Sequence, residues 1–112
     1  MNSIQRGRQY EDLALEYLIA QGLKLVERNY NCKWGELDLL MHEQDALVIV
    51  EVRYRKNAHY GSALESVTAN KQARIVAATK HYIMTHKINQ PIRFDVLAIT
   101  GDLQPDWIKN AF

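Results

Sequence analysis

The sequence predicts an α/β domain in which two helices flank one mixed sheet of four to five strands. Three observations lead to this fold class. Two stretches carry apolar residues at helical spacing, several short stretches alternate or are continuously apolar as strands do, and no linker, repeat or low-complexity tract divides the 112 residues. A chain of this length suits one hydrophobic core, so a single domain is expected over residues 1–112.

The expected elements follow the order α, β, β, β, α, β, β. A first helix at residues 5–21 has Gly22 as its left-handed cap, and Asn29, Asn31 and Gly35 mark the turn region after the first strand. The remaining elements are strands at 23–30, 36–41 and 46–54, a helical turn opened by a Ser62–Glu65 capping box, a helix at 69–86 capped by Thr68, and strands at 92–100 and around Trp107.

Composition points to a cytoplasmic protein without a membrane partner. Apolar residues make up 47% and charged residues 24% of the chain, and no apolar stretch is long enough to span a bilayer or serve as a signal sequence. Cys32 is the only cysteine, which excludes an internal disulfide. The net charge is only +1, but basic residues gather mid-chain, as a phosphate-binding surface requires: Arg53, Arg55, Lys56, His59, Lys71, Arg74, Lys80 and His81.

Acidic residues lie inside two of the expected strands. A tight hairpin centred between Gln44 and Asp45 would set Asp38 opposite Glu51 and Glu36 opposite Arg53. Two facing carboxylates destabilise a strand pair and raise each other's pKa unless a cation lies between them. A hard divalent ion such as Mg²⁺ or Mn²⁺ would resolve the conflict.

Other interpretations of these residues stay open from the sequence alone. Asp38 and Glu51 also suit the solvated face of a hairpin. Glu36 either supports the acidic site or pairs with Arg53 across the strands, and the pair is favoured. Asp95 lies in an apolar strand, where a structural and a functional role are equally compatible with the pattern. Both tryptophans, Trp34 and Trp107, are expected to pack in the core.

Motifs along nearly the whole chain resemble the YraN family of small bacterial proteins. They are Gly7-x-x-x-Glu11-x-x-Ala14, Asn29-Tyr30, Gly35-Glu36-Leu37-Asp38-Leu39, Val50-Glu51-Val52-Arg53, Tyr60-Gly61, Lys71-Gln72, Arg93-Phe94-Asp95 and Asn110-Ala111-Phe112. That family in turn resembles Holliday-junction resolvases and the restriction-endonuclease-like PD-(D/E)xK nucleases, which implies a restriction-endonuclease-like three-layer α/β/α fold. Glu11 matches the helix acid of that pattern, Asp38 the strand Asp and Glu51 the Glu, whereas Arg53 falls where the pattern has Lys.

The resemblance implies a Mg²⁺-dependent endonuclease, with Mn²⁺ as an alternative ion, that acts on branched or structured DNA. Its metal ligands would be Asp38, Glu51 and Glu11, and Arg53 would join these three as the catalytic residues. Resolvase relatives act as dimers, so a homodimer is implied as well. Arg53 cannot act as a base, because its pKa is too high, so a noncatalytic nucleic-acid-binding module is the alternative. Phosphate contacts are expected from Arg55, Lys56, Lys71 and Arg74.

Overall fold

The computed structural model describes residues 3–56 and 63–112. Its elements in chain order are α1 (Ser3–Ala20), β1 (Lys24–Cys32), β2 (Gly35–Glu43), β3 (Ala46–Arg55), the 3-10 helix η1 (Leu64–Ser66), α2 (Ala69–His86), β4 (Ile92–Thr100) and β5 (Pro105–Ile108). In this part of the chain, no helix has both the length and the apolar character that crossing a membrane requires.

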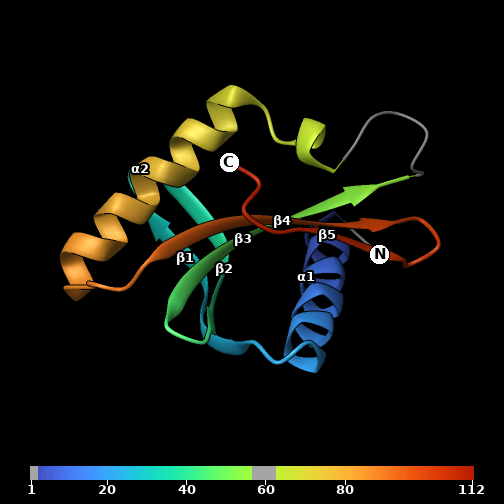
Figure 1. Cartoon of the computed structure of the whole chain (residues 1–112). Helices are drawn as coiled ribbons and strands as arrows, with labels where there is room; N and C mark the ends of the chain where they lie inside the picture. Colours follow the sequence, from blue (N-terminus) through green and yellow to red (C-terminus); the bar gives the residue numbers. More distant parts are fainter. Residues whose placement is uncertain (1–2, 57–62) are drawn as a thin grey trace.

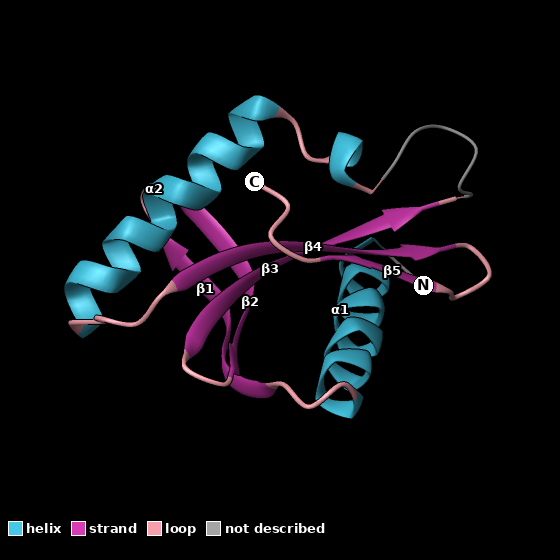
Figure 2. Cartoon of the chain, viewed as in Figure 1, coloured by secondary structure: helices cyan, strands magenta, loops and turns pink. Residues whose placement is uncertain are grey.

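The five strands form one mixed sheet in the order β1-β2-β3-β4-β5. Neighbouring strands are antiparallel except for β3 and β4, which run parallel because α2 connects them. The helices α1 and α2 cover opposite faces of the sheet (Figures 1 and 2). The predicted three-layer α/β architecture is therefore confirmed.

Local sequence signals place the helix ends where they were expected. The helix α2 begins after Thr68, whose Oγ1 accepts a hydrogen bond from the Lys71 backbone N at 3.2 Å, and it ends at His86 as predicted. After α1, Gly22 has a φ of +99°, a conformation that a residue with a Cβ adopts only with strain. Ser62, the first residue of the expected capping box, lies outside the described residues, although the helical turn itself forms at η1.

The first strand is longer than predicted. It continues through Asn29, which has a φ of +55°, and ends at Cys32. Asparagine tolerates the left-handed region better than most residues, so the expected turn is instead a kink inside the strand. The kink reverses the direction of the side chains, because Arg28 contacts α1 whereas Tyr30 contacts α2. The register of β1 against β2 places Asn29 opposite Asp38.

Two hydrophobic clusters fill the space on either side of the sheet. On the α2 side, Ile75 and Tyr82 pack with Leu37, Ile49 and Val96. The α1 side is filled by a second cluster that comprises Ala14, Leu18, Leu23, Leu39, Met41, Val48, Val50, Leu97 and Ile99. Both clusters are contributed by the central strands, which makes β2, β3 and β4 the rigid frame of the molecule.

Asp95 fastens β5 and the C-terminal segment to this frame. Its fully buried carboxylate accepts hydrogen bonds from Arg93 at 2.9 and 2.8 Å, from Trp107 Nε1 at 2.9 Å and from the Asn110 backbone N at 3.0 Å. Arg93 also bonds Glu43 at 2.6 Å. These contacts give Asp95 a structural role, and Trp107 packs against the core on the α1 side as a partly buried residue.

We expect Asp95→Ala to lower the free energy of unfolding by about 3 kcal/mol or more, because it leaves buried donors and the Arg93 charge without their acceptor. Urea unfolding of the variant measures the loss. The control is Asp12→Ala, which breaks the more exposed Asp12–Arg28 pair, with side chains 60% and 30% exposed, and should cost less than about 1 kcal/mol. Similar losses in the two variants would contradict the role assigned to Asp95.

Candidate functional site

The β2–β3 hairpin has the predicted register, but its ladder stops short of the acidic residues. The pairs run from Glu43↔Ala46 to Leu39↔Val50, and beyond Val50 the two strands separate. There a side chain replaces the backbone pairing: Asp38 Oδ2 accepts a hydrogen bond from the Val52 backbone N at 2.9 Å. The Asp38 carboxyl thus replaces a backbone acceptor at the point where the strands diverge.

Asp38 and Glu51 meet in this opening. Glu51 is only 4% exposed. Burial, the negative charge of Glu51 and a hydrogen bond to Glu51 together raise the pKa of Asp38 to about 8, against the opposing effect of the Val52 N–H. Burial also raises the pKa of Glu51, while Lys71, the Asp38 hydrogen bond and Arg53 lower it. Because its pKa is raised to about 8, Asp38 is the favoured holder of a proton in this pair near neutral pH, and it shares a hydrogen bond with Glu51.

A lysine from α2 completes the pair. Lys71 Nζ lies 3.6 Å from Glu51 Oε1, and its side chain is 41% exposed, so the ammonium reaches the buried carboxylate from the solvent side. The sequence predicts Lys71 as a phosphate contact, and it also offers Lys56 and Lys71 as candidates to substitute in space for the lysine that the nuclease pattern has at Arg53. The Lys71 contact with Glu51 could not be derived from sequence spacing, because it depends on how α2 packs over β3.

The predicted pairing of Glu36 with Arg53 is wrong. The two residues lie beyond the end of the β2–β3 ladder, and no ion pair joins them within residues 3–56 and 63–112. Burial raises the pKa of Glu36, as do the charges of Asp38 and Glu11, so Glu36 belongs electrostatically to the acidic site. Arg53 Nε is buried without a hydrogen-bond partner in the described part of the chain.

Glu11 approaches the site from α1 but is held by another residue. Arg28 Nη2 lies 3.3 Å from Glu11 Oε1 and 2.8 Å from Asp12 Oδ1. The charge of Glu11 nevertheless contributes to the raised pKa of Asp38. Its assignment as a third ligand remains a prediction that would require Arg28 to release it.

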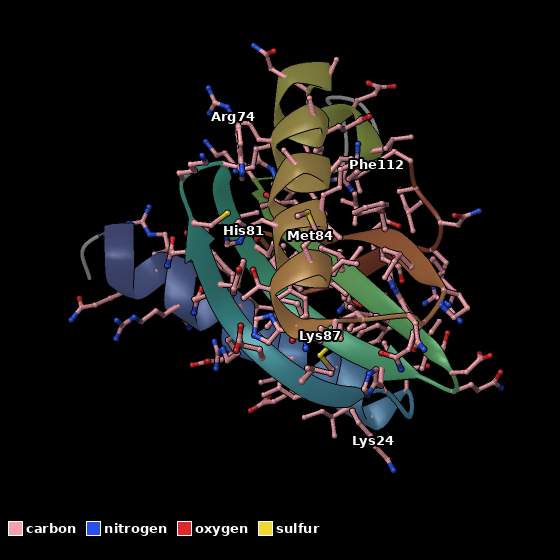
Figure 3. The ribbon with its side chains drawn as sticks, turned by 90° about the vertical axis from the view of Figure 1, so that its left-hand side faces the viewer. Lys24, Arg74, His81, Met84, Lys87 and Phe112 are labelled. Carbon is pink, nitrogen blue, oxygen red and sulfur yellow. The ribbon has the colours of Figure 1, made fainter. Side chains whose placement is uncertain are left out.

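The four residues expected to contact phosphate differ in their surroundings. Arg55 is engaged by Asp106 at 3.0 Å and its side chain is only 10% exposed. Lys56, directly after β3, and Arg74, on α2, are exposed. In Figure 3, Arg74 lies on the side of α2 that is nearer the ends of β1 and β2. A basic face that includes Lys71 and Arg74 therefore borders the acidic pair.

Comparison with known proteins places the chain in a family. The family model described as "Uncharacterised protein family UPF0102" matches residues 10–99, which include every acidic residue of the site. The chain belongs to the UPF0102 family. A UPF0102 protein of Saccharophagus degradans is 53% identical over 110 residues, covering 96% of this chain and 92% of the relative. One of Aeromonas hydrophila is 52% identical over 110 residues, covering 96% and 84%.

The expected membership of a family of small bacterial proteins is thus confirmed at the level of UPF0102. The names of these relatives mention no activity, substrate or metal, so they do not test the resemblance to junction-resolving nucleases. Functional inference for this UPF0102 protein has to come from the chemistry of Asp38, Glu51 and Lys71.

The buried acids fit a hard cation. Among the residues that the structure describes, no three His, Cys, Asp or Glu side chains converge closely enough to hold a metal ion. Mg²⁺ commonly uses only one or two protein carboxylates and completes its shell with water and substrate phosphate. The Asp38–Glu51 pair is of this kind, and a dication would offset the repulsion that raises the pKa of Asp38.

We expect the stability of the metal-free protein to fall as pH rises between about 4 and 8. In that window folded Asp38 holds a proton that the unfolded chain has lost, so the free energy of unfolding decreases, by up to about 1.4 kcal/mol per pH unit. The stabilisation is fully present below the unfolded pKa and is lost as pH passes the folded one. Asp38→Asn should flatten the slope, measured by urea unfolding in EDTA.

Asp45→Asn provides the control, because Asp45 is an exposed acid in the turn of the same hairpin. It should leave the slope unchanged. If Asp38→Asn and the wild type lose stability equally over this pH range, Asp38 does not hold the proton assigned to it.

Proposed function

We propose that this protein is a nucleic-acid-binding, Mg²⁺-dependent endonuclease that acts on branched or structured DNA. The observation that carries the proposal is the Asp38–Glu51 pair, in which Glu51 is buried and Asp38 half-buried, with Lys71 at 3.6 Å from Glu51. Buried carboxylates with a raised pKa and one specific charged partner are typical of functional sites rather than of a solvated hairpin face.

The ion would be held by Asp38 and Glu51. Glu11 would be an additional ligand if it left its ion pair with Arg28 and turned toward the metal. When bound, Mg²⁺ would supply positive charge to the scissile phosphate and lower the pKa of water, which makes phosphodiester hydrolysis feasible at neutral pH. Binding would also displace the proton from Asp38, so affinity should increase with pH up to about 8.

Lys71 and Arg53 together would perform the roles of the single lysine in the PD-(D/E)xK nuclease pattern. Lys71 presents a compact ammonium next to Glu51 and can stabilise charge that develops on the phosphate. Arg53, two residues along β3 from Glu51, offers a planar guanidinium suited to bidentate contact with phosphate oxygens. The departure of Arg53 from the nuclease pattern is therefore compensated by a residue from a different element.

A noncatalytic nucleic-acid-binding module remains the alternative function. It would keep the nuclease fold and the basic face of α2 and would lack turnover because Arg53 stands in place of the catalytic lysine. A homodimer, as in resolvases, belongs to the proposal as well, because two opposed strands must be cut to resolve a junction. Cleavage assays separate the two functions, whereas metal-dependent stability separates both from a protein in which the acidic pair serves folding alone.

We predict that Mg²⁺ or Mn²⁺ stabilises the wild-type protein at pH 8 and that Asp38→Asn abolishes most of this effect. A ligand at ten times its Kd that binds only the folded state adds about 1.4 kcal/mol. Calorimetry with and without the ion measures the shift in Tm, and Asp45→Asn serves as the control. Equal shifts in wild type and Asp38→Asn would count against ligation by Asp38.

We further predict that wild-type protein cleaves a four-way junction in Mg²⁺ in preference to its matched duplex. Glu51→Gln should lower the rate by more than about 100-fold, since even outer partners of metal ligands cost up to that amount. Lys71→Ala should lower it by about 100-fold through loss of charge stabilisation. Single-turnover cleavage followed on gels gives these rates.

Lys24→Ala is the matched control, because Lys24 is an exposed lysine on β1 and lies outside the site. It should cleave like the wild type. If the wild type binds the junction but shows no cleavage beyond that of Glu51→Gln, the endonuclease proposal is rejected and the binding module stands.

A further inference from the structure

A half-open pocket of about 380 Å³ lies between the β1–β2 turn and the second half of α2. It is lined by Lys33, Trp34, Ala77, Lys80, His81 and Met84. None of these residues is acidic, and none takes part in the acidic site. The pocket is therefore a separate feature on the same basic face.

The walls of the pocket are large apolar side chains that the fold leaves open. Trp34 is 49% exposed and Met84 is 79% exposed. The prediction that Trp34 packs in the core was wrong, because Trp34 lies in the turn beyond the paired ends of β1 and β2, where the sheet no longer covers it. An indole kept at the surface next to a thioether forms a flat, polarisable site.

Basic residues lie beside these apolar side chains. Lys33 Nζ lies 4.8 Å from the centre of the Trp34 ring, and Lys80 and His81 line the opposite wall on α2. The His81 ring is fixed by a 2.6 Å hydrogen bond between its Nδ1 and the Tyr30 hydroxyl. Aromatic surface combined with lysines is the combination that recognises a base together with its phosphates.

We propose that this pocket receives one unpaired nucleobase, stacked on Trp34 and covered by Met84, with Lys33 and Lys80 contacting the flanking phosphates. The inference rests on the proposed function for the path of the strand, and it deepens that function by naming single-stranded or splayed DNA as the substrate feature. Every base has a π-face, so such stacking tolerates any sequence.

The position of the pocket on α2 supports this path. Lys71, Arg74, Ala77, His81 and Met84 recur every three to four residues and so lie along one side of the helix. Arg74, His81 and Met84 follow one another down α2 in Figure 3. The turn lies against the same helix, because a Cβ built on Gly35 would be 3.8 Å from the Arg74 Cβ.

The number of nucleotides between the pocket and the acidic pair can be estimated from the spacing of residues along α2. At a rise of about 1.5 Å per residue, Ala77 lies about 9 Å beyond Lys71 along the helix axis. That length corresponds to roughly three stacked nucleotides at about 3.4 Å each. A duplex would have to unstack a base to fill the pocket, whereas a branched substrate already offers one. The pocket thus accounts for a preference for branched over paired DNA.

Fluorescence and anisotropy test the proposal on the full chain in EDTA, where cleavage is absent. The probes are a labelled oligothymidylate and a labelled blunt duplex of the same length. The oligothymidylate should quench the tryptophan emission of the wild type, and Trp34→Phe should abolish this quenching while it keeps the affinity within about threefold. Trp34→Ala should weaken oligothymidylate binding by about tenfold, toward the lower end for loss of one stacked base.

Ile19→Ala is the control, because Ile19 is 52% exposed on α1, on the opposite side of the sheet. It should bind like the wild type. If the oligothymidylate leaves the tryptophan emission of the wild type unchanged and Trp34→Ala keeps full affinity, the proposal of a base-binding pocket is overturned. The proposed function still stands in that case if the wild type cleaves the junction. A change of oligomeric state in Trp34→Ala, seen by sedimentation, without a change in strand affinity would overturn it too, in favour of a protein contact. Absence of binding to either probe and to a junction would overturn both proposals.

Discussion

The separation of β2 from β3 beyond the Leu39↔Val50 pair is the constraint on which the site depends. A continued ladder would have given the Val52 N–H a backbone acceptor in place of the Asp38 carboxyl. The strands diverge instead, and the Asp38 side chain satisfies the Val52 N–H that would otherwise lack its acceptor. The same side chain is thereby fixed beside Glu51, so a structural requirement of the backbone and the chemistry of the acidic pair are met by one carboxyl.

Basic residues offset the negative charge around this opening on both sides of the sheet. Lys71 of α2 offsets Glu51, and Arg28, directly before the kink at Asn29, offsets Glu11 of α1. Arg28 and Tyr30 lie on either side of Asn29 and face opposite helices, so the kink allows one strand to contribute to both sides of the sheet. The buried charge of Asp95 is compensated separately by Arg93, which keeps the anchoring of the C-terminal segment independent of the site.

Much of this arrangement could be predicted from local sequence. The hairpin register followed from the turn at Gln44 and Asp45, and the bounds of α2 and β4 followed from Thr68 and the apolar pattern of the strand. The loss of the Glu36–Arg53 pair and the exposure of Trp34 could not, because they arise where the β2–β3 ladder stops and where β1 and β2 end. The positive φ of Asn29 could not either, because it is a kink inside a strand that continues on both sides. The contact of Lys71 with Glu51 depends on helix packing, which spacing along one chain does not encode.

Crystals grown above pH 8 and soaked in Mn²⁺ test the central claim most directly, because the pKa of Asp38 is raised to about 8 and a higher pH favours its ionised form. An anomalous difference map locates manganese without assumptions about coordination. The account predicts one strong peak between the carboxylates of Asp38 and Glu51, within coordination distance of both and absent from crystals of Asp38→Asn. A map without a peak there, in which the two carboxyls still share their hydrogen bond, would contradict the claim that this pair is a metal-binding site.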